Sequence, residues 1–577
     1  MAYGILIDGT PTDGANPWID SLVWGGAWTD ADGGKVTINY AVQTGYDPYG
    51  VFAGSSLSWS AAALGALGKV ISSWEAVANI DFVQTAPATA DAWFWVNTDS
   101  QVWSNLGYSE VPAYDSTEPL YLMLNGQDSS WNATGLQKGG FAYVTILHEM
   151  GHLLGLAHPH DGGSAWDATL FPGVTAAFDS YGTYNLNQGI FTTMSYNDGW
   201  ATRFPGHGAL GYGYQATPMA LDIAAIQAIY GANTTFASGN NTYALPKANT
   251  AGAYWSCIWD TGGTDTVSNA GGTLACTIDL RAAPLTGPNA GGWVSWNAGI
   301  VGGFTIANGV KIENALGGSG ADRITGNIYA NRLDGAAGND TIWGGGGNDT
   351  IVGGTGADTM LGGAGNDVYL ADNVGEKIFE TTTQTSTVNA GGTDLVQSSV
   401  SLSLNTHAGV RFVENLTLTG TANLNGTGNG LANTLTGNGG ANTLSGLSGN
   451  DVLRGNGGAD RLIGGLGVDQ LYAGVDSQRD VFVFDDLHTG TGAARDSVFN
   501  FVSGIDDLDL GQIDADSATA GDDGFAFGGA AAGAHSVWLA ASGADVIVFG
   551  DVNGDAVADF EIRIAAIGSL GAGDFVL

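Results

Sequence analysis

The sequence predicts a multidomain protein in which an α+β domain precedes an all-β region containing a parallel β-roll and a β-sandwich. Helical patterns are confined to about the first 235 of the 577 residues. A nine-residue period of glycine, aspartate and one large apolar residue begins near residue 317. Such a period predicts stacked turns joined by short strands, because each repeat buries its apolar residue only against its neighbours.

The N-terminal part has the apolar spacing of amphipathic helices in three segments, and three shorter apolar runs resemble strands. We expect helices at 58–78, 141–154 and 217–230, and strands at 36–42, 92–96 and 119–124. Gly155 and Gly231 follow the last two helices and are expected to end them. Thr217 is the expected N-cap of the last helix, with Pro218 at its first position.

Composition and repeats divide the chain into six segments. A longer duplication lies over the repeats, since VKIENALGGSGAD near residue 310 has a counterpart, VRFVENLTLTGTAN, near residue 410. We expect an α+β domain at 1–235, a β segment at 236–316, a first repeat block at 317–371, a β segment between the blocks at 372–425, a second repeat block at 426–475 and a C-terminal β domain at 476–577.

The net charge is −40, from 56 acidic and 16 basic residues, yet charged residues make up only 12% of the chain. The usual share is about 25%, so the acidity comes from a lack of Lys and Arg. The few basic residues are scattered, which argues against nucleic-acid binding. No run of about 18 apolar residues predicts a membrane span. Of the acidic residues 47 are Asp and 9 are Glu, a bias that favours turns and calcium loops.

The nine-residue repeat, GGxGxDxUx with U a large apolar residue, predicts calcium binding. Its glycines permit tight turns, and its aspartates and turn carbonyls offer the hard oxygen ligands that Ca²⁺ prefers. Two repeats would form one coil of the roll. The expected calcium ligands are Asp322, Asp340, Asp349, Asp358, Asp367, Asp451, Asp460 and Asp469. Asn433 and Asn442 stand at equivalent positions without a charge, and we expect weak or empty calcium sites there.

Residues 148–158, HEMGHLLGLAH, have the spacing of a catalytic zinc site. His148 and His152 share one helix face and can reach the same metal. Gly155 can reverse the chain, so that His158 returns as the third ligand, and the fourth zinc position stays open for chemistry. Glu149 lies beside the ligands and can act as a general base on water.

The extended HExxHxxGxxH pattern resembles that of metzincin proteases, and the chain resembles the serralysins among them. Pro159 follows the last histidine, as is typical of serralysins, and TTMSY at 192–196 resembles their Met-turn. Further similar segments are PMALDIAAIQAIYGAN (218–233), IWDTGGTDT (258–266), NGVKIENALGGSGAD (308–322), GDVNGDAVADFEI (550–562) and DFVL (574–577). The resemblance covers nearly the whole chain, including the RTX calcium repeats, and implies a peptidase of the M10B kind.

The resemblance implies roles for two residues of the Met-turn. Met194 would form an apolar floor beneath one catalytic zinc, and Tyr196 would be a fifth zinc ligand at rest and a donor to the reacting oxygen. His160 stands where relatives commonly have Gly; it either binds a second metal or faces solvent, and we expect it to face solvent. Cys257 and Cys276 are unusual in this family; they are either free thiols or a pair on neighbouring strands.

The resemblance therefore predicts a secreted zinc endopeptidase, stabilised by several calcium ions, that acts on extracellular proteins. Substrate would add as a strand near residues 107–113. The alternative is a secreted calcium-binding structural or adhesive protein, surface-layer-like, with a relict protease domain. A lipase is disfavoured because no GxSxG elbow is present.

Export is expected without an N-terminal signal peptide, since the first basic residue is Lys35. The acidic and apolar tail at 574–577 resembles the C-terminal signal that a type I secretion apparatus reads. The expected partners are protein or peptide substrates and this apparatus, and the expected state is a monomer.

Overall fold

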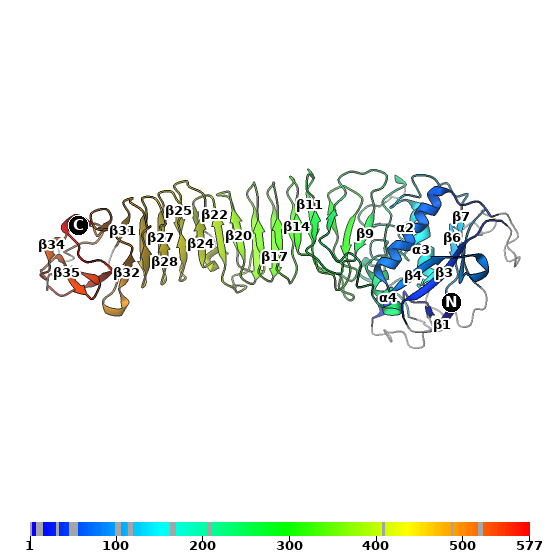
Figure 1. Cartoon of the computed structure of the whole chain (residues 1–577), viewed down its shortest axis with the longest axis horizontal. Helices are drawn as coiled ribbons and strands as arrows, with labels where there is room; N and C mark the ends of the chain where they lie inside the picture. Colours follow the sequence, from blue (N-terminus) through cyan, green and yellow to red (C-terminus); the bar gives the residue numbers. More distant parts are fainter. Residues whose placement is uncertain are drawn as a thin grey trace. The chain divides into compact units, whose positions relative to one another are not determined.

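The computed structural model describes residues 3–6, 16–29, 34–45, 56–98, 106–112, 119–161, 169–205, 210–406, 410–485, 489–516 and 523–577. They form two compact units, 1–318 and 319–577. The predicted fold class is confirmed: a mixed helix-and-strand region comes first, and mainly parallel strands follow (Figure 1). No described helix is long and apolar enough to cross a bilayer.

The N-terminal part of the first unit is a mixed sheet covered by helices. Its strands have the order β4-β3-β5-β7-β6, all parallel except β6, which runs antiparallel to β7 at one edge. The strands are β3 (Val36–Val42), β4 (Ile80–Gln84), β5 (Ala92–Asn97), β6 (Gly107–Ser109) and β7 (Leu120–Asn125); β1 (Tyr3–Leu6) and β2 (Gly26–Thr29) pair separately. The three strands expected from the sequence are β3, β5 and β7.

The helices of this unit are α1 (Pro17–Asp20), α2 (Ala61–Val77), α3 (Phe141–Leu153) and α4 (Ala220–Tyr230). The α3 helix packs against β6, β7 and α2 (Figure 1). The prediction that Thr217 is the N-cap of the last helix is wrong. This helix, α4, begins at Ala220, and the Asp222 carboxylate accepts the backbone N–H of Met219 at 2.9 Å. A carboxylate is a better partner than a hydroxyl for the positive end of a helix.

The rest of the first unit is β-structure. One sheet contains β8 (Thr242–Ala244), β10 (Thr266–Ser268) and β14 (Asn314–Leu316). Another has the order β11-β12-β13-β9, with β9 (Trp255–Ile258), β11 (Cys276–Asp279), β12 (Ser295–Asn297) and β13 (Gly303–Ile306). Cys257 and Cys276 are therefore not on neighbouring strands; both are buried, and no disulfide joins them. Three strand spacings of about 4.8 Å separate β9 from β11, which is too far for a disulfide.

The second unit is a parallel roll of short strands, in which most strands pair with the strand two places later in the chain (Figure 1). The apolar residue of each repeat points inward: Ile324 pairs with Ile342 and Ile342 with Met360, and all three are at most 1% exposed. One coil thus takes eighteen residues, or two repeats, as the period predicts. In the second block Leu435, Leu444, Leu453, Leu462 and Leu471 are all fully buried.

The strands of the roll fall into three rows. The first is β15 (Arg323–Thr325), β17 (Thr341–Gly346), β19 (Thr359–Ala364) and β21 (Lys377–Phe379). The second is β16 (Arg332–Asp334), β18 (Thr350–Val352), β20 (Val368–Ala371), β22 (Leu395–Ser398), β24 (Asn415–Leu418), β26 (Thr434–Thr436), β28 (Val452–Arg454), β30 (Gln470–Tyr472) and β32 (Asp496–Phe499). The third is β23 (Leu402–Ser403), β25 (Asn425–Thr427), β27 (Thr443–Ser448), β29 (Arg461–Leu466), β31 (Val481–Val483), β33 (Asp507–Asp509) and β38 (Phe575–Val576).

The second row is extended after β32 by β37 (Phe560–Ile564), β36 (Asp545–Gly550), β35 (Ser536–Ser542) and β34 (Ala526–Gly529). The pairs β36–β37 and β35–β36 are antiparallel, so the parallel winding of the roll stops here.

Candidate active site and calcium ladder

The α3 helix and the turn after it bring three histidines together. His148 and His152 lie one helical turn apart on α3. Gly155 then reverses the chain with a φ of +98°, and a Cβ there would lie only 2.3 Å from the backbone oxygen of Gly26. Only glycine fits both the backbone conformation and the contact. The reversed chain returns His158 to the other two rings.

The ring nitrogens converge on one point. The Nε2 of His158 lies 2.9 Å from that of His148 and 3.0 Å from that of His152. Each Nδ1 has its own acceptor: Thr193 O at 2.8 Å for His148, and Leu156 O at 2.8 Å for His152. Burial lowers the pKa of His148 to about 3 and also lowers that of His152.

Neutral rings that donate through Nδ1 turn three Nε2 lone pairs toward each other. Such an arrangement is repulsive unless a cation accepts all three, so the donor set fits a zinc ion. The acceptor for His158 Nδ1 is the carboxylate of Asp161, at 2.5 Å. Sequence reasoning missed Asp161, although a carboxylate three residues after the last ligand of a zinc motif is a usable signal.

The Met-turn lies beneath these histidines. Met194 is fully buried, and a Cβ on Gly151 would lie 2.6 Å from its sulfur, so α3 rests directly on it. The turn is held by Asp222, whose carboxylate accepts Thr192 Oγ1 at 2.6 Å and the Thr193 N–H at 2.7 Å. Sequence reasoning assigned no role to Asp222, because its partners lie about thirty residues away.

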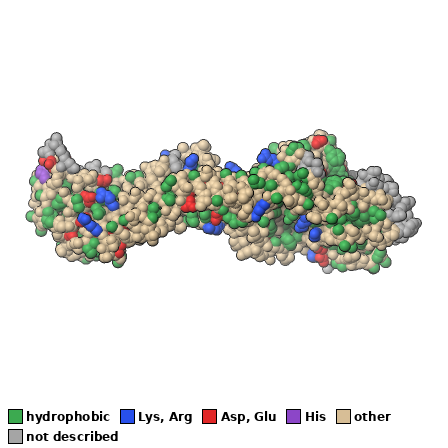
Figure 2. Space-filling model, turned by 90° about the horizontal axis from the view of Figure 1, so that it is seen from above, with side chains coloured by type: hydrophobic (Ala, Val, Ile, Leu, Met, Phe, Trp, Pro, Cys, Tyr) green, Lys and Arg blue, Asp and Glu red, His purple; other side chains and the backbone are tan. Residues whose placement is uncertain are grey.

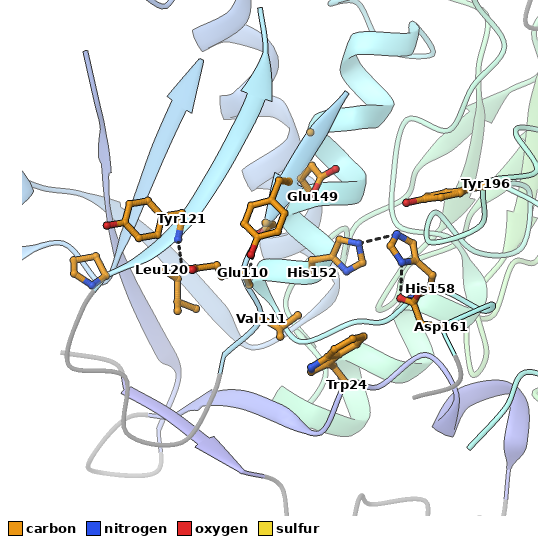
Figure 3. Close-up of a pocket in the computed structure, with 14 residues that line it drawn as sticks. Trp24, Glu110, Val111, Leu120, Tyr121, Glu149, His152, His158, Asp161 and Tyr196 are labelled. Atoms are coloured by element: carbon orange, nitrogen blue, oxygen red, sulfur yellow. Dashed lines mark hydrogen bonds and ion pairs between the residues drawn. The ribbon is translucent and has the colours of Figure 1, made fainter. Parts of the chain in front are cut away.

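Tyr196 and His160 pack around the last ligand. The Tyr196 ring lies 4.6 Å from that of His158, and its hydroxyl points toward the His158 and Glu149 side of the cleft (Figure 3). The prediction that His160 faces solvent is wrong: its ring stacks on His158 at 4.9 Å and contacts Tyr196, and its side chain is only 18% exposed. Stacking on two rings removes its apolar faces from water.

Glu149 lies at the meeting point of two cavities. The larger, about 620 Å³, is lined by β6, His152, His158 and Tyr196, and the smaller, about 330 Å³, by His148, Phe178 and Asp198. Burial raises the pKa of Glu149 to about 8, and a divalent cation among the histidines would lower it again. Strand β6, within the expected substrate segment 107–113, forms one wall; residue 113 lies outside the described residues.

In the second unit, the repeat aspartates form a ladder along the roll. In seven of the eight predicted ligands, all but Asp322, one carboxylate oxygen accepts a backbone N–H from the coil before it, as when Asp340 Oδ1 accepts that of Asp322 at 2.7 Å. The other oxygen is buried without a hydrogen-bond partner at Asp340, Asp349, Asp358, Asp367, Asp451, Asp460 and Asp469. Figure 2 shows few Asp and Glu side chains on the face it presents, in keeping with this inward placement.

Each unpartnered oxygen faces a space that fits calcium. A Cβ on Gly335 would lie 2.3 Å from Asp340 Oδ2 and 2.6 Å from Gly353 O, so glycine leaves a cradle between two oxygens. At Asn442 the amide oxygen Oδ1 lies beside the equivalent cradle, at Gly437, but it is uncharged and already accepts the Asn438 N–H at 2.8 Å. The amide Nδ2 donates to Leu424 O at 3.0 Å. Weak or empty calcium sites at Asn433 and Asn442 stay a prediction.

The ladder extends beyond the nine-residue pattern, which sequence reasoning missed. Six further carboxylates accept a backbone N–H in the same way: Glu376, Asp394, Glu414, Asp480, Asp496 and Asp506. Asp506, for example, is 2% exposed and accepts the N–H of Asp480 at 3.0 Å. The spacing of these residues is irregular, so periodicity does not reveal them.

Comparisons with known proteins agree with these two sites. Residues 220–434 match the family described as peptidase M10 serralysin C terminal, and residues 427–462 and 436–471 match the RTX calcium-binding nonapeptide repeat. The chain is 33% identical to a serralysin of Photorhabdus luminescens over 267 residues, covering 44% of this chain and 51% of that protein.

The chain is therefore similar to the serralysins over part of its length. It is also 31% identical to the metallopeptidase AprA of Pseudomonas marginalis, over 52% of this chain and 63% of that protein, and 30% identical to a serralysin C of Dickeya chrysanthemi, over 55% and 65%. The chain thus spans about half to two thirds of the length of these relatives. The serralysin type implies a catalytic zinc, and the RTX repeats imply structural calcium.

Gly107 leaves room for the side chain of Glu149, the predicted general base. A Cβ at Gly107 would lie 2.6 Å from both Cγ and Oε1 of Glu149. We expect Gly107→Ala to displace the carboxylate and to lower kcat/KM for a peptide about 10²-fold, since small misplacements of catalytic groups are costly. Gly65→Ala on α2, where nothing lies within 4 Å, is the matched control and should keep full activity. Unchanged kinetics in Gly107→Ala would contradict this role.

Proposed function

We propose that the protein is an extracellular zinc endopeptidase stabilised by calcium. The observation that carries the proposal is the convergence of three imidazole rings beside Glu149, in a cleft walled by an exposed sheet edge. An open metal position next to a carboxylate is what peptide hydrolysis needs, whereas a structural zinc site is closed by a fourth protein ligand.

The residues of the cleft have separable tasks. An extended peptide adds as a strand to β6, which aligns the scissile bond with the histidines. Zinc, when bound by the histidines, supplies Lewis-acid chemistry to the carbonyl group and to water. The Glu149 carboxylate takes a proton from the attacking water and returns it to the leaving nitrogen. The Tyr196 hydroxyl donates a hydrogen bond to the developing oxyanion.

The second unit gives this enzyme its dependence on calcium. Millimolar calcium outside the cell would neutralise the ladder, whereas inside the cell the carboxylates would repel one another and keep the roll open. We therefore propose that the chain leaves the cell through a type I secretion apparatus before the roll forms, and acts as a monomer on extracellular proteins.

A casein digest tests the activity. With millimolar calcium present throughout, we expect cleavage that a zinc-selective chelator stops and added zinc restores. Calcium in excess keeps the roll folded, so loss of cleavage reports on zinc alone. Absence of cleavage in protein loaded with both metals would favour the alternative, a calcium-binding structural protein with a relict site. The intact set of Glu149 and three histidines argues against that alternative.

A further inference from the structure

We propose that Asp367, Glu380 and Asp394 form a calcium site of their own, where the nine-residue period of the first repeat block ends. Glu380 and Asp394 lie outside the repeat pattern, in the segment 372–425 between the two blocks.

The three residues come from consecutive passes of the roll. Asp367 precedes β20 and Asp394 precedes β22, and these strands pair in parallel, with Val368 opposite Leu395. The Asp367 N–H donates to Asp394 Oδ1 at 2.9 Å across 27 residues, whereas the regular step of the ladder is 18 residues. The nine additional residues follow Glu380, which comes directly after β21.

Glu380 stands where the repeat has glycine. The step from Gly344 to Gly362 is eighteen residues, and the next such step leads to Glu380. A Cβ on Gly344 would meet Asp349 Oδ2 at 2.2 Å and Gly362 O at 2.6 Å. A Cβ on Gly362 would instead lie 2.2 Å from Asp367 Oδ2 and 2.3 Å from the Tyr369 hydroxyl, with no backbone carbonyl among its nearest atoms. The regular carbonyl ligand is thus replaced at this coil, and the Glu380 side chain enters the same space.

The cluster is buried and lacks a counter-charge. Asp367 is 1% exposed, and Glu380 and Asp394 are fully buried. Their ligand oxygens lie within 4.8 Å of one another. Asp367 Oδ2, Glu380 Oε2 and Asp394 Oδ2 have no hydrogen-bond partner, and the Tyr369 hydroxyl donates to Glu380 Oε1. Among the described residues, no Lys or Arg forms an ion pair with any of the three.

Three carboxylates in one dry space repel each other strongly unless a cation or protons neutralise them. The atoms that face the space are oxygens of three carboxyl groups, which suit Ca²⁺ and not a metal that prefers nitrogen or sulfur. A calcium ion here would join the last regular coil of the first block to the longer coil that follows. The alternative is a proton shared between Glu380 and Asp394 without a metal.

Glu380→Gln separates the two possibilities in the full-length protein. The Gln amide would donate into the unpartnered oxygens of Asp367 and Asp394, as the Asn442 amide does at its own position. We expect the variant to bind one calcium ion fewer per chain than the wild type, measured by elemental analysis after gel filtration at millimolar free calcium. Asp372→Asn, an exposed neighbour with the same change of charge, should bind the full number.

Wild-type crystals grown in calcium chloride provide the second readout, which does not depend on how the variant folds. An anomalous peak among the three carboxylates is expected. Equal calcium counts in wild type and Glu380→Gln, or an absence of density at this position, would overturn the proposal and favour the shared proton. Neither result bears on peptide hydrolysis, so this site and the enzymatic activity can fail independently.

Discussion

Glu149→Gln is expected to lower the rate of peptide hydrolysis by about 10²–10⁴-fold, the usual contribution of a general base. The side chain is 7% exposed and borders both cavities at the histidine cluster. Glutamine keeps the shape of the side chain but cannot accept a proton from water. Zinc content should stay at one ion per chain, because the three ligands and their partners are untouched. The measurements are turnover of a fluorogenic peptide and elemental analysis.

Glu110→Gln is the matched control, since Glu110 lines the same cleft. Its carboxylate accepts the Tyr121 N–H at 2.9 Å, and an amide oxygen can do the same. We expect the control to retain turnover within a few-fold of the wild type. Normal turnover in Glu149→Gln would exclude Glu149 as the general base, and loss of zinc in that variant would make the result a binding effect.

Removal of calcium is expected to reverse the pH dependence of stability in the second unit. Burial raises the pKa of Asp340 to about 7, of Asp349 to about 8 and of Asp469 to about 7, against an ordinary value of 3.8. A carboxyl group whose pKa is higher in the folded than in the unfolded state stabilises the fold below about pH 4 and loses this contribution as pH rises through the folded value. Without calcium, the unit should therefore be less stable at pH 8 than at pH 5.

Calcium reverses this pH dependence of stability because it binds only the ionised carboxylates and competes with protons. In millimolar calcium the unit should be at least as stable at pH 8 as at pH 5. Thermal unfolding followed by circular dichroism, in calcium-free and calcium-containing buffers at both pH values, measures the four midpoints. Parallel pH profiles with and without calcium would contradict the assignment of the ladder as a calcium site, as would a fully formed roll at pH 8 in chelator.

The convergence of the three histidines was predictable because their arrangement is local. Residues four apart on a helix share a face whatever the rest of the fold does, so His148 and His152 follow from spacing alone. Gly155 is predictable for the same reason, since a positive φ and a close backbone contact at the helix end both require it. The apolar period likewise predicted which residues fill the roll, and Ile342 and Leu453 are fully buried.

Residues that act across long stretches of chain were missed. Asp222 holds the Met-turn through Thr192 and Thr193, and nothing near it in the sequence indicates this role. The expected exposure of His160 failed because its partner, Tyr196, is 36 residues away. The separation of Cys257 from Cys276 depended on the order of four strands, which composition does not specify.

The sequence by itself determined the zinc motif, the eighteen-residue coil and the inward-facing residue of each repeat. These depend on hydrogen bonds and side-chain directions within a helix or between regularly spaced turns. The tertiary structure alone decided which other carboxylates join the ladder, because the N–H that Asp394 accepts lies 27 residues away and is reached only through the pairing of β20 with β22. Burial of an unpaired charge is costly, so the register of the strands, and not the count of acidic residues, determines where calcium is needed.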